Sequence, residues 1–213
     1  MILTLRFASN LSAFTVAATL AATAIASTTT GTATAQETQT AIFAGGCFWC
    51  VESDFDHVNG VLDTTSGYIG GESQNPTYQN HSGHLEAVRV TFDPSRVSYD
   101  KLLDVYWHSI DPTDGGGQFC DRGHSYTTAI FATNSDQLKK AEATKAQVAK
   151  DLGTVATEVR KASTFWTAEG YHQDYYKKNP VKYKFYRAGC GRNATVERVW
   201  GDKAYQGIKD AVG

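Results

Sequence analysis

The sequence predicts an α+β fold, because strand-like and helix-like segments alternate as strand, helix, strand, strand, helix, strand. Two segments carry this prediction. Residues 84–92 alternate in the manner of a half-buried strand, and residues 98–110 place apolar side chains at helical spacing. We therefore expect a ferredoxin-like split β-α-β sandwich of two layers, with an antiparallel sheet, helices on one face and an extended C-terminal tail.

Each element follows from a local pattern of apolar residues and of the residues that end helices and strands. The predicted strands are 39–43, 61–69, 84–92, 125–132 and 155–161. The predicted helices are 47–57, 98–110, 135–152 and a short aromatic helix at 168–178. Residues 70–83 are rich in Gly, Ser, Asn and Pro and read as a loop. From Asn179 onward the pattern is weak, so no element is predicted there.

The two ends of the chain divide it into three parts. The first 36 residues contain one basic residue, Arg6, and no acid, and the Ala33-Thr34-Ala35 run offers small residues for cleavage. This composition predicts a cleavable export signal at 1–36, with an organelle transit peptide as the alternative. A catalytic domain is expected at 37–180 and a tail at 181–213. The mature protein would then be periplasmic or secreted.

Composition and charge exclude several classes of protein. The 213 residues are 41% hydrophobic and 20% charged, with a formal net charge of −2. These values fit a soluble globular chain and exclude collagen, coiled coils and wholesale disorder. Without clustered Lys and Arg there is no electrostatic reason to expect nucleic acid or a membrane surface as a partner.

Cys47 is the candidate nucleophile. It follows Gly45-Gly46 at the predicted start of a helix, where free N–H groups and the helix dipole lower the pKa of a thiol. A plain disulfide between Cys47 and Cys50, or an inert buried pair, is the alternative. Zinc held by the cysteines and His124 is disfavoured because Cys120 and Cys190 are single residues far apart in the sequence. We therefore predict neither a metal nor a cofactor.

Glu86 is the second informative residue. It lies on the apolar face of its strand, between neighbours that include Val88 and Phe92. Burial there would raise the pKa of its carboxyl and make it a general acid near neutral pH. A solvated strand end or an ion pair with Arg89 is the alternative.

Five further side chains have an ordinary structural explanation when they are taken singly. Tyr78 and Tyr126 lie in or beside loops, where buried aromatics with a bonded hydroxyl are common. Asp121 lies in a turn-forming run. His81 and His84 have the spacing of metal ligands, but they flank Ser-Gly in a loop without accompanying carboxylates, so a metal site there is disfavoured.

Taken together, these motifs make the chain similar to the A-class peptide methionine sulfoxide reductases. The resemblance covers about 41–179. Its motifs are 45–50 (Gly-Gly-Cys-Phe-Trp-Cys), 75–78 (Asn-Pro-Thr-Tyr), 83–88 (Gly-His-Leu-Glu-Ala-Val), 121–126 (Asp-Arg-Gly-His-Ser-Tyr) and 169–173 (Glu-Gly-Tyr-His-Gln).

The resemblance implies a role for each candidate residue. Cys47 would attack the sulfur of the S epimer of methionine sulfoxide and become a sulfenic acid, while Glu86 protonates the departing oxygen. The other implied roles are hydrogen bonds to that oxygen from Tyr78 and Tyr126, positioning by Asp121, and a cradle for the S-methyl group from Phe48 and Trp49. The resemblance also implies that a thioredoxin-like reductant returns the oxidised enzyme to its thiol form. We expect a monomer.

Two positions depart from the pattern of the family. Cys50 stands where Gly is commoner, and Thr127 stands where Arg usually follows the tyrosine. Either Cys50 or Cys190 could resolve the sulfenic acid, and Cys120 has no predicted role. A general thiol–disulfide oxidoreductase that uses Cys47 and Cys50 remains an alternative function, and a zinc-stabilised binding module is a third hypothesis.

Overall fold

The computed structural model of the protein describes residues 2–4, 8 and 37–209. The predicted export signal and its cleavage site therefore lie, apart from a few residues, outside the described part of the chain. Within the described residues, no helix combines the length and the apolar character that crossing a membrane requires. Residues 37–209 belong to one compact unit, which begins at Gln36.

A six-stranded sheet forms the centre of this unit. Its strands are β1 (Gln39–Gly45), β2 (Val61–Ile69), β3 (Leu85–Phe92), β6 (Thr128–Ala132), β7 (Glu158–Lys161) and β8 (Trp166–Thr167). They follow the order β7-β6-β1-β3-β2-β8. Among the strand pairs of this sheet that the structure describes, β6–β7 is parallel and the others are antiparallel. β3 lies between β1 and β2, so strands that are far apart in the sequence are neighbours. The α+β class predicted from the sequence is confirmed.

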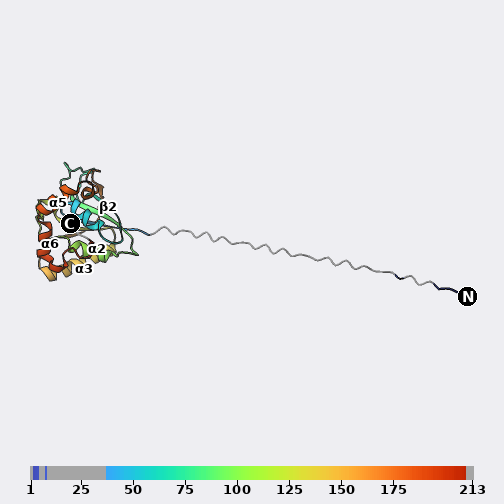
Figure 1. Cartoon of the computed structure of the whole chain (residues 1–213). Coiled ribbons are helices and arrows are strands. Elements are labelled where there is room, and N and C mark those ends of the chain that lie inside the picture. Colours follow the sequence, from blue (N-terminus) through green and yellow to red (C-terminus); the bar gives the residue numbers. More distant parts are fainter. Residues whose placement is uncertain (1, 5–7, 9–36, 210–213) are drawn as a thin grey trace. The chain divides into compact units, whose positions relative to one another are not determined.

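Helices accompany the sheet (Figure 1), and the described residues contain six α-helices. They are α1 (Phe48–Asp56), α2 (Tyr99–Trp107), α3 (Ser135–Leu152), α4 (Tyr175–Lys178), α5 (Pro180–Gly189) and α6 (Arg192–Trp200). The short elements are the hairpin strands β4 (Gly117–Gln118) and β5 (Asp121–Arg122) and the 3-10 helices η1 (His124–Tyr126) and η2 (Gly201–Lys203). The side chains of Ser98 and Asn134 accept N–H groups at the first turns of α2 and α3, as residues that begin helices do.

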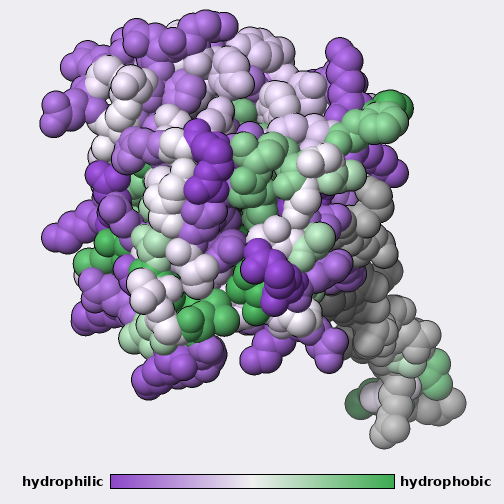
Figure 2. Space-filling model, turned by 90° about the vertical axis from the view of Figure 1, so that its left-hand side faces the viewer, coloured by the Kyte–Doolittle hydropathy of each residue, from purple (hydrophilic) through white to green (hydrophobic). Residues whose placement is uncertain are grey.

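The two faces of the sheet carry separate apolar clusters, and β3 contributes to both. Val88, Val90 and Phe92 join the larger cluster with α1 and α2, whereas Leu85 and Ala87 join the smaller one on the opposite face. This is the alternation predicted for the strand. It sends the side chain of Glu86 toward α1 rather than toward solvent. Most of the face of the molecule shown in Figure 2 is hydrophilic, with hydrophobic residues visible between the polar ones.

Two predictions about the C-terminal third were wrong. Residues 168–178 are helical only over α4, because His172 ends a turn on Glu169 and Asp174 takes a left-handed conformation with φ 53°. The segment after Asn179 is not an extended tail, since it forms α5 and α6. Their buried positions are occupied partly by arginine, and for this reason an apolar pattern was not visible in the sequence.

Candidate active site

Cys47 lies at the residue that begins α1, directly after β1. Its carbonyl accepts the N–H groups of Cys50 at 3.1 Å and Val51 at 3.4 Å, which starts the helix. Gly46 makes the turn possible. It has φ +82°, and a Cβ at this position would lie 2.6 Å from the Cβ of Gln118. Gly46 thus lets the β4–β5 hairpin approach the start of α1 closely.

The thiols of Cys47 and Cys50 are both buried and hydrogen-bonded to one another. Burial raises the pKa of Cys47 well above its ordinary value, and Cys50 and Glu86 raise it further. The expectation that the helix start lowers the pKa of Cys47 is therefore wrong, because desolvation outweighs the helix dipole in this position. The pKa of Cys50 is instead lowered to about 7, first by the hydrogen bond from Cys47 and then by two buried arginines.

The carboxyl of Glu86 meets the first turn of α1. Its Oε2 accepts the backbone N–H of Phe48 at 3.0 Å, and the residue is 2% exposed. Burial raises its pKa to about 8, while the bond from Phe48 opposes the shift. At neutral pH the carboxyl therefore retains its proton. The predicted burial of this acid beside the nucleophile is what the structure shows.

Tyr78 and Tyr126 come together although they are 48 positions apart in the sequence. Their hydroxyls share a hydrogen bond, and burial together with the charge of Glu86 raises the pKa of both. Tyr78 is held by its backbone N–H, which donates to Glu169 at 2.9 Å. The other oxygen of Glu169 accepts the hydroxyl of Tyr68 at 2.9 Å. Both phenols thus remain neutral hydrogen-bond donors on one side of Glu86.

Phe48 and Trp49 are part of an aromatic wall. Phe48 packs against the ring of His172 at 4.9 Å, and Trp49 stacks on Tyr175 at 3.7 Å with the ring planes 7° apart. The indole Nε1 of Trp49 donates to Nδ1 of His172 at 3.0 Å, which fixes the tryptophan ring. Burial lowers the pKa of His172, so that its imidazole is neutral and can accept this bond. The wall is apolar enough to hold a methyl group.

Asp121 reaches the same place from the β4–β5 hairpin. Its carboxylate accepts the hydroxyl of Tyr186 from α5. The Tyr186 hydroxyl also faces the sulfur of Cys47 and lowers the pKa of that thiol. The pKa of Asp121 is raised by burial, and the bond from Tyr186 opposes this. Asp121 therefore connects to the nucleophile through one tyrosine.

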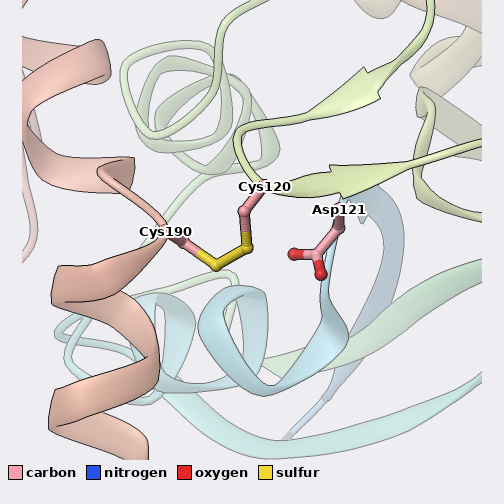
Figure 3. Close-up of side chains that lie close together, drawn as sticks. All are labelled: Cys120, Asp121 and Cys190. Atoms are coloured by element: carbon pink, nitrogen blue, oxygen red, sulfur yellow. A yellow bond between two sulfur atoms is a disulfide. The ribbon is translucent and has the colours of Figure 1, made fainter.

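Cys120 and Cys190 form a disulfide between the β4–β5 hairpin and the junction of α5 with α6 (Figure 3). The carboxylate of Asp121 points toward this disulfide, and one of its oxygens and the two sulfur atoms all lie within 4.8 Å of one another. The two sulfur atoms are bonded to each other, so they are not available as thiolate ligands for a metal. Cys120, which had no predicted role, is exposed to solvent.

Comparisons with known proteins agree with this geometry. The family model for peptide methionine sulfoxide reductases matches residues 39–204. The chain belongs to the peptide methionine sulfoxide reductase family.

Relatives of this reductase are found in several bacteria. It is 59% identical over 177 residues to peptide methionine sulfoxide reductase MsrA 2 of Rhizobium meliloti (strain 1021), covering 82% of this chain and 89% of the relative. It is 47% identical over 176 residues to the MsrA of Bacillus subtilis (strain 168), covering 79% and 99%. Methionine sulfoxide reductase A of Corynebacterium diphtheriae has a similar structure, with a TM-score of 0.65 and 32% identity over 68% of this chain and 76% of that one.

Sequence reasoning missed several residues that build the site of this reductase. Tyr186 and the buried arginines of α5 and α6 lie in the segment that had no visible pattern. The spacing of Tyr183 and Arg187, one helical turn apart with Tyr186 between them, was the signal available in the sequence. The histidines at 81 and 84 serve local structure, because each bonds backbone oxygens of its own loop.

Proposed function

We propose that this reductase returns the S epimer of methionine sulfoxide, free and in proteins, to methionine. The observation that carries the proposal is the bond between Oε2 of Glu86 and the N–H of Phe48 at 3.0 Å. It holds a protonated carboxyl beside the first turn of the helix that Cys47 begins. A sulfoxide oxygen leaves only when it is protonated, so a thiol and a neutral carboxyl side by side suit this chemistry.

The residues supply the parts of one reaction step. The sulfur of Cys47 attacks the sulfoxide sulfur, Glu86 gives its proton to the oxygen, and that oxygen ends on Cys47 as a sulfenic acid while methionine leaves. Tyr78 and Tyr126 donate hydrogen bonds to the oxygen as negative charge grows on it. The S-methyl group lies against the aromatic wall described above. Asp121 orients Tyr186, whose hydroxyl faces the attacking sulfur and lowers its pKa.

Cys50 is the thiol that we assign to the resolving step. It is hydrogen-bonded to Cys47, whereas Cys190 is joined to Cys120. The Cys50 sulfur attacks the sulfenic sulfur, the hydroxyl leaves with a proton as water, and a Cys47–Cys50 disulfide results. Both members of this disulfide are buried, at 6% and 2% exposure, so a protein reductant cannot reach them directly.

The Cys120–Cys190 pair offers a route from this buried disulfide to the surface. A thioredoxin-like dithiol would reduce the Cys120–Cys190 disulfide at its exposed end, Cys120. The freed Cys190 thiolate would then attack the inner disulfide, and completion of the exchange returns Cys47 and Cys50 to thiols and forms Cys120–Cys190 again. In this scheme Cys190 regenerates the Cys47 and Cys50 thiols, and Cys120 is its disulfide partner.

The cellular setting of the reductase is also a proposal. We propose that residues 1–36 are an export signal and that the domain works outside the cytoplasm as a monomer, on oxidised proteins. The composition of the leader supports this, with its apolar run and small residues before Gln36. N-terminal sequencing of the protein purified from the periplasm and from the cytoplasm tests it: an intact Met1 on exported material would contradict cleavage.

The assay that tests the function measures thiol-dependent reduction of the separated S and R epimers of a methionine sulfoxide peptide. We expect reduction of the S epimer alone, and none by Cys47→Ser. Reduction of neither epimer, together with rapid reduction of a protein disulfide, would favour the general thiol–disulfide oxidoreductase. A Cys47→Ser protein that retained sulfoxide turnover would show that the nucleophile is misassigned.

A further inference from the structure

A buried cluster of three charged side chains lies one helical turn beyond Cys50. Its members are Asp54 of α1, Arg187 of α5 and Arg192 of α6, each less than 5% exposed. Asp54 Oδ1 lies 2.8 Å from Nη1 of Arg187, and Asp54 Oδ2 lies 3.4 Å from Nη2 of Arg192. Cys50 and Asp54 are four residues apart and so share one face of α1. The reductase function uses none of these charges directly.

The charges in this cluster do not cancel. Two guanidinium groups carry +2 and one carboxylate carries −1, which leaves one positive charge in a desolvated place. Neutral groups bond most of the remaining N–H positions: Arg192 donates to the carbonyls of Gly45 at 3.1 Å and Ser109 at 3.0 Å. Arg187 Nη2 and Arg192 Nε have no hydrogen-bond partner among the described residues. A buried excess charge of this kind calls for an anion nearby.

The sulfur of Cys50 can supply that anion. Both arginines act on Cys50 with their charge, and the thiol of Cys47 donates a hydrogen bond to it. The other groups that face Cys50 are Glu86 and the phenols of Tyr183 and Tyr186. These groups are neutral near pH 7, because the pKa of Glu86 is about 8 and burial raises the pKa of both tyrosines. Asp54 opposes the thiolate, but the arginines already neutralise it.

We propose that Arg187 and Arg192 are positioning residues that hold Cys50 as a thiolate in the resting enzyme, so that Cys50 acts first as the base for Cys47 and then as the resolving thiol. The inference rests on the proposed reductase function. As the Cys47 sulfur attacks the sulfoxide, its proton passes to the Cys50 sulfur, while the proton of Glu86 goes to the oxygen. The products are a Cys47 sulfenic acid, a Cys50 thiol and a Glu86 carboxylate, so protons and charge balance. The Cys50 proton and the sulfenic hydroxyl then leave as water.

This arrangement explains how a buried thiol such as Cys47 can be an effective nucleophile. Its pKa is raised by burial, so it holds its proton until a base takes it. The base is the neighbouring sulfur that the hydrogen bond already joins to it. The arginines come from the two C-terminal helices, and Arg192 also bonds the carbonyl of Gly45 just before Cys47. The C-terminal helices thus contribute to the chemistry through Cys50.

The test uses the full-length Cys47→Ser protein with its Cys120–Cys190 disulfide intact, in which Cys50 is the only thiol. The serine hydroxyl retains a donor to the Cys50 sulfur. Thiolate absorbance at 240 nm is followed between pH 4 and pH 10, and the signal of the Cys47→Ser/Cys50→Ser protein is subtracted. We expect a single titration step with a midpoint near pH 7, the value to which the pKa of Cys50 is lowered. A midpoint at or above that of a free thiol, roughly 8.5, would overturn the proposal.

Substitution of the arginines adds a second measurement. In the Cys47→Ser protein, Arg192→Gln is expected to raise the midpoint of the Cys50 titration by about one pH unit or more. Arg192→Lys retains the positive charge and is expected to raise the midpoint by less than half as much. Circular dichroism checks that each variant is folded. An unmoved midpoint in a folded Arg192→Gln protein would also contradict the proposal. Sulfoxide reduction by the wild type is measured in parallel, so that a failed titration with intact activity refutes this inference while leaving the reductase function in place.

Discussion

The hydroxyl of Tyr186 donates to Oδ2 of Asp121 at 2.5 Å and so ties helix α5 to the β4–β5 hairpin beside the nucleophile. The same hydroxyl faces the sulfur of Cys47 and lowers the pKa of that thiol, and the ring of Tyr186 meets the edge of Trp49 at 5.6 Å. One side chain thus links the C-terminal helices, the hairpin and the start of α1. This position suggests that the hydroxyl orients the attacking sulfur.

Tyr186→Phe is therefore expected to slow sulfoxide reduction while leaving the fold intact. The ring is retained, and only the hydrogen bonds are lost, so we expect turnover to fall by roughly 5- to 10-fold, the equivalent of one hydrogen bond. Tyr176→Phe is the matched control, because it removes a hydroxyl that bonds Asp56 at 2.7 Å and no residue of the site. Equal rates for the two variants in a steady-state assay would show that the Tyr186 hydroxyl has no part in the reaction.

Glu86→Gln removes the proton donor that we propose but retains the shape of the side chain. General acid catalysis contributes about 10²- to 10⁴-fold, and we expect a loss of that order in the single-turnover rate near neutral pH. The wild-type rate should fall as the pH rises through about 8, where Glu86 loses its proton. The residual rate of Glu86→Gln should not show this fall. A wild-type profile that stays flat between pH 7 and pH 9 would contradict the assignment of Glu86 as the acid.

The raised pKa of Glu86 also has a consequence for stability. In the unfolded chain the carboxyl ionises near its ordinary value of 4.5, whereas in the folded chain it ionises near 8. Below both pKa values the carboxyl is protonated in both states and does not change the free energy of unfolding. As the pH rises from 4.5 to 8, the carboxyl ionises in the unfolded chain but not in the folded one, so the unfolded state is favoured progressively. Glu86→Gln should therefore gain stability relative to the wild type over this interval. Urea unfolding of both proteins at pH 5 and pH 8 measures it, and an equal difference at the two pH values would be inconsistent with a buried neutral acid.

Local patterns were enough to predict most of the fold and the centre of the site. The alternation of strand β3 placed Glu86 correctly, because the period of a strand fixes which side chains share a face. The Gly-Gly-Cys run placed the nucleophile at the start of α1. Both inferences depend on residues that are close together in the sequence.

The remaining features depend on contacts between distant residues, which a single sequence does not show. The raised pKa of Cys47 follows first from its burial in the folded chain, so the local helix dipole was a poor guide. Helices α5 and α6 were missed because they bury arginines against Asp54, and such positions look polar in the sequence. The pairing of Cys120 with Cys190 joins residues 70 positions apart.

The exposed disulfide predicts a difference between two reductants. Cys120→Ser should leave turnover with a small dithiol such as dithiothreitol within about two-fold of the wild type, because a small thiol can reach the inner disulfide. Turnover with a thioredoxin-like protein should fall by roughly 10-fold or more, since the exposed sulfur that it attacks is gone. Cys50→Ser is the comparison, and it should slow turnover with both reductants. If Cys120→Ser reacted with the protein reductant as the wild type does, the route through this pair would be wrong.

Asp54 is predicted to be among the side chains most costly to remove. Asp54→Ala leaves Arg187 and Arg192 buried without a carboxylate, and breaking a buried ion pair in this way costs about 3–5 kcal/mol of unfolding free energy. Lys140→Ala is the control, because that lysine pairs with Asp100 and Asp136 at the surface, where water screens the charges. Urea denaturation should show a large loss for the first variant and almost none for the second. The remaining folded Asp54→Ala protein should also hold the Cys50 thiolate at lower pH than the parent, because the Asp54 carboxylate that opposes it is absent while both arginines remain. If Asp54→Ala lost stability but did not change the pH at which Cys50 ionises, the cluster would stabilise the fold without acting on Cys50.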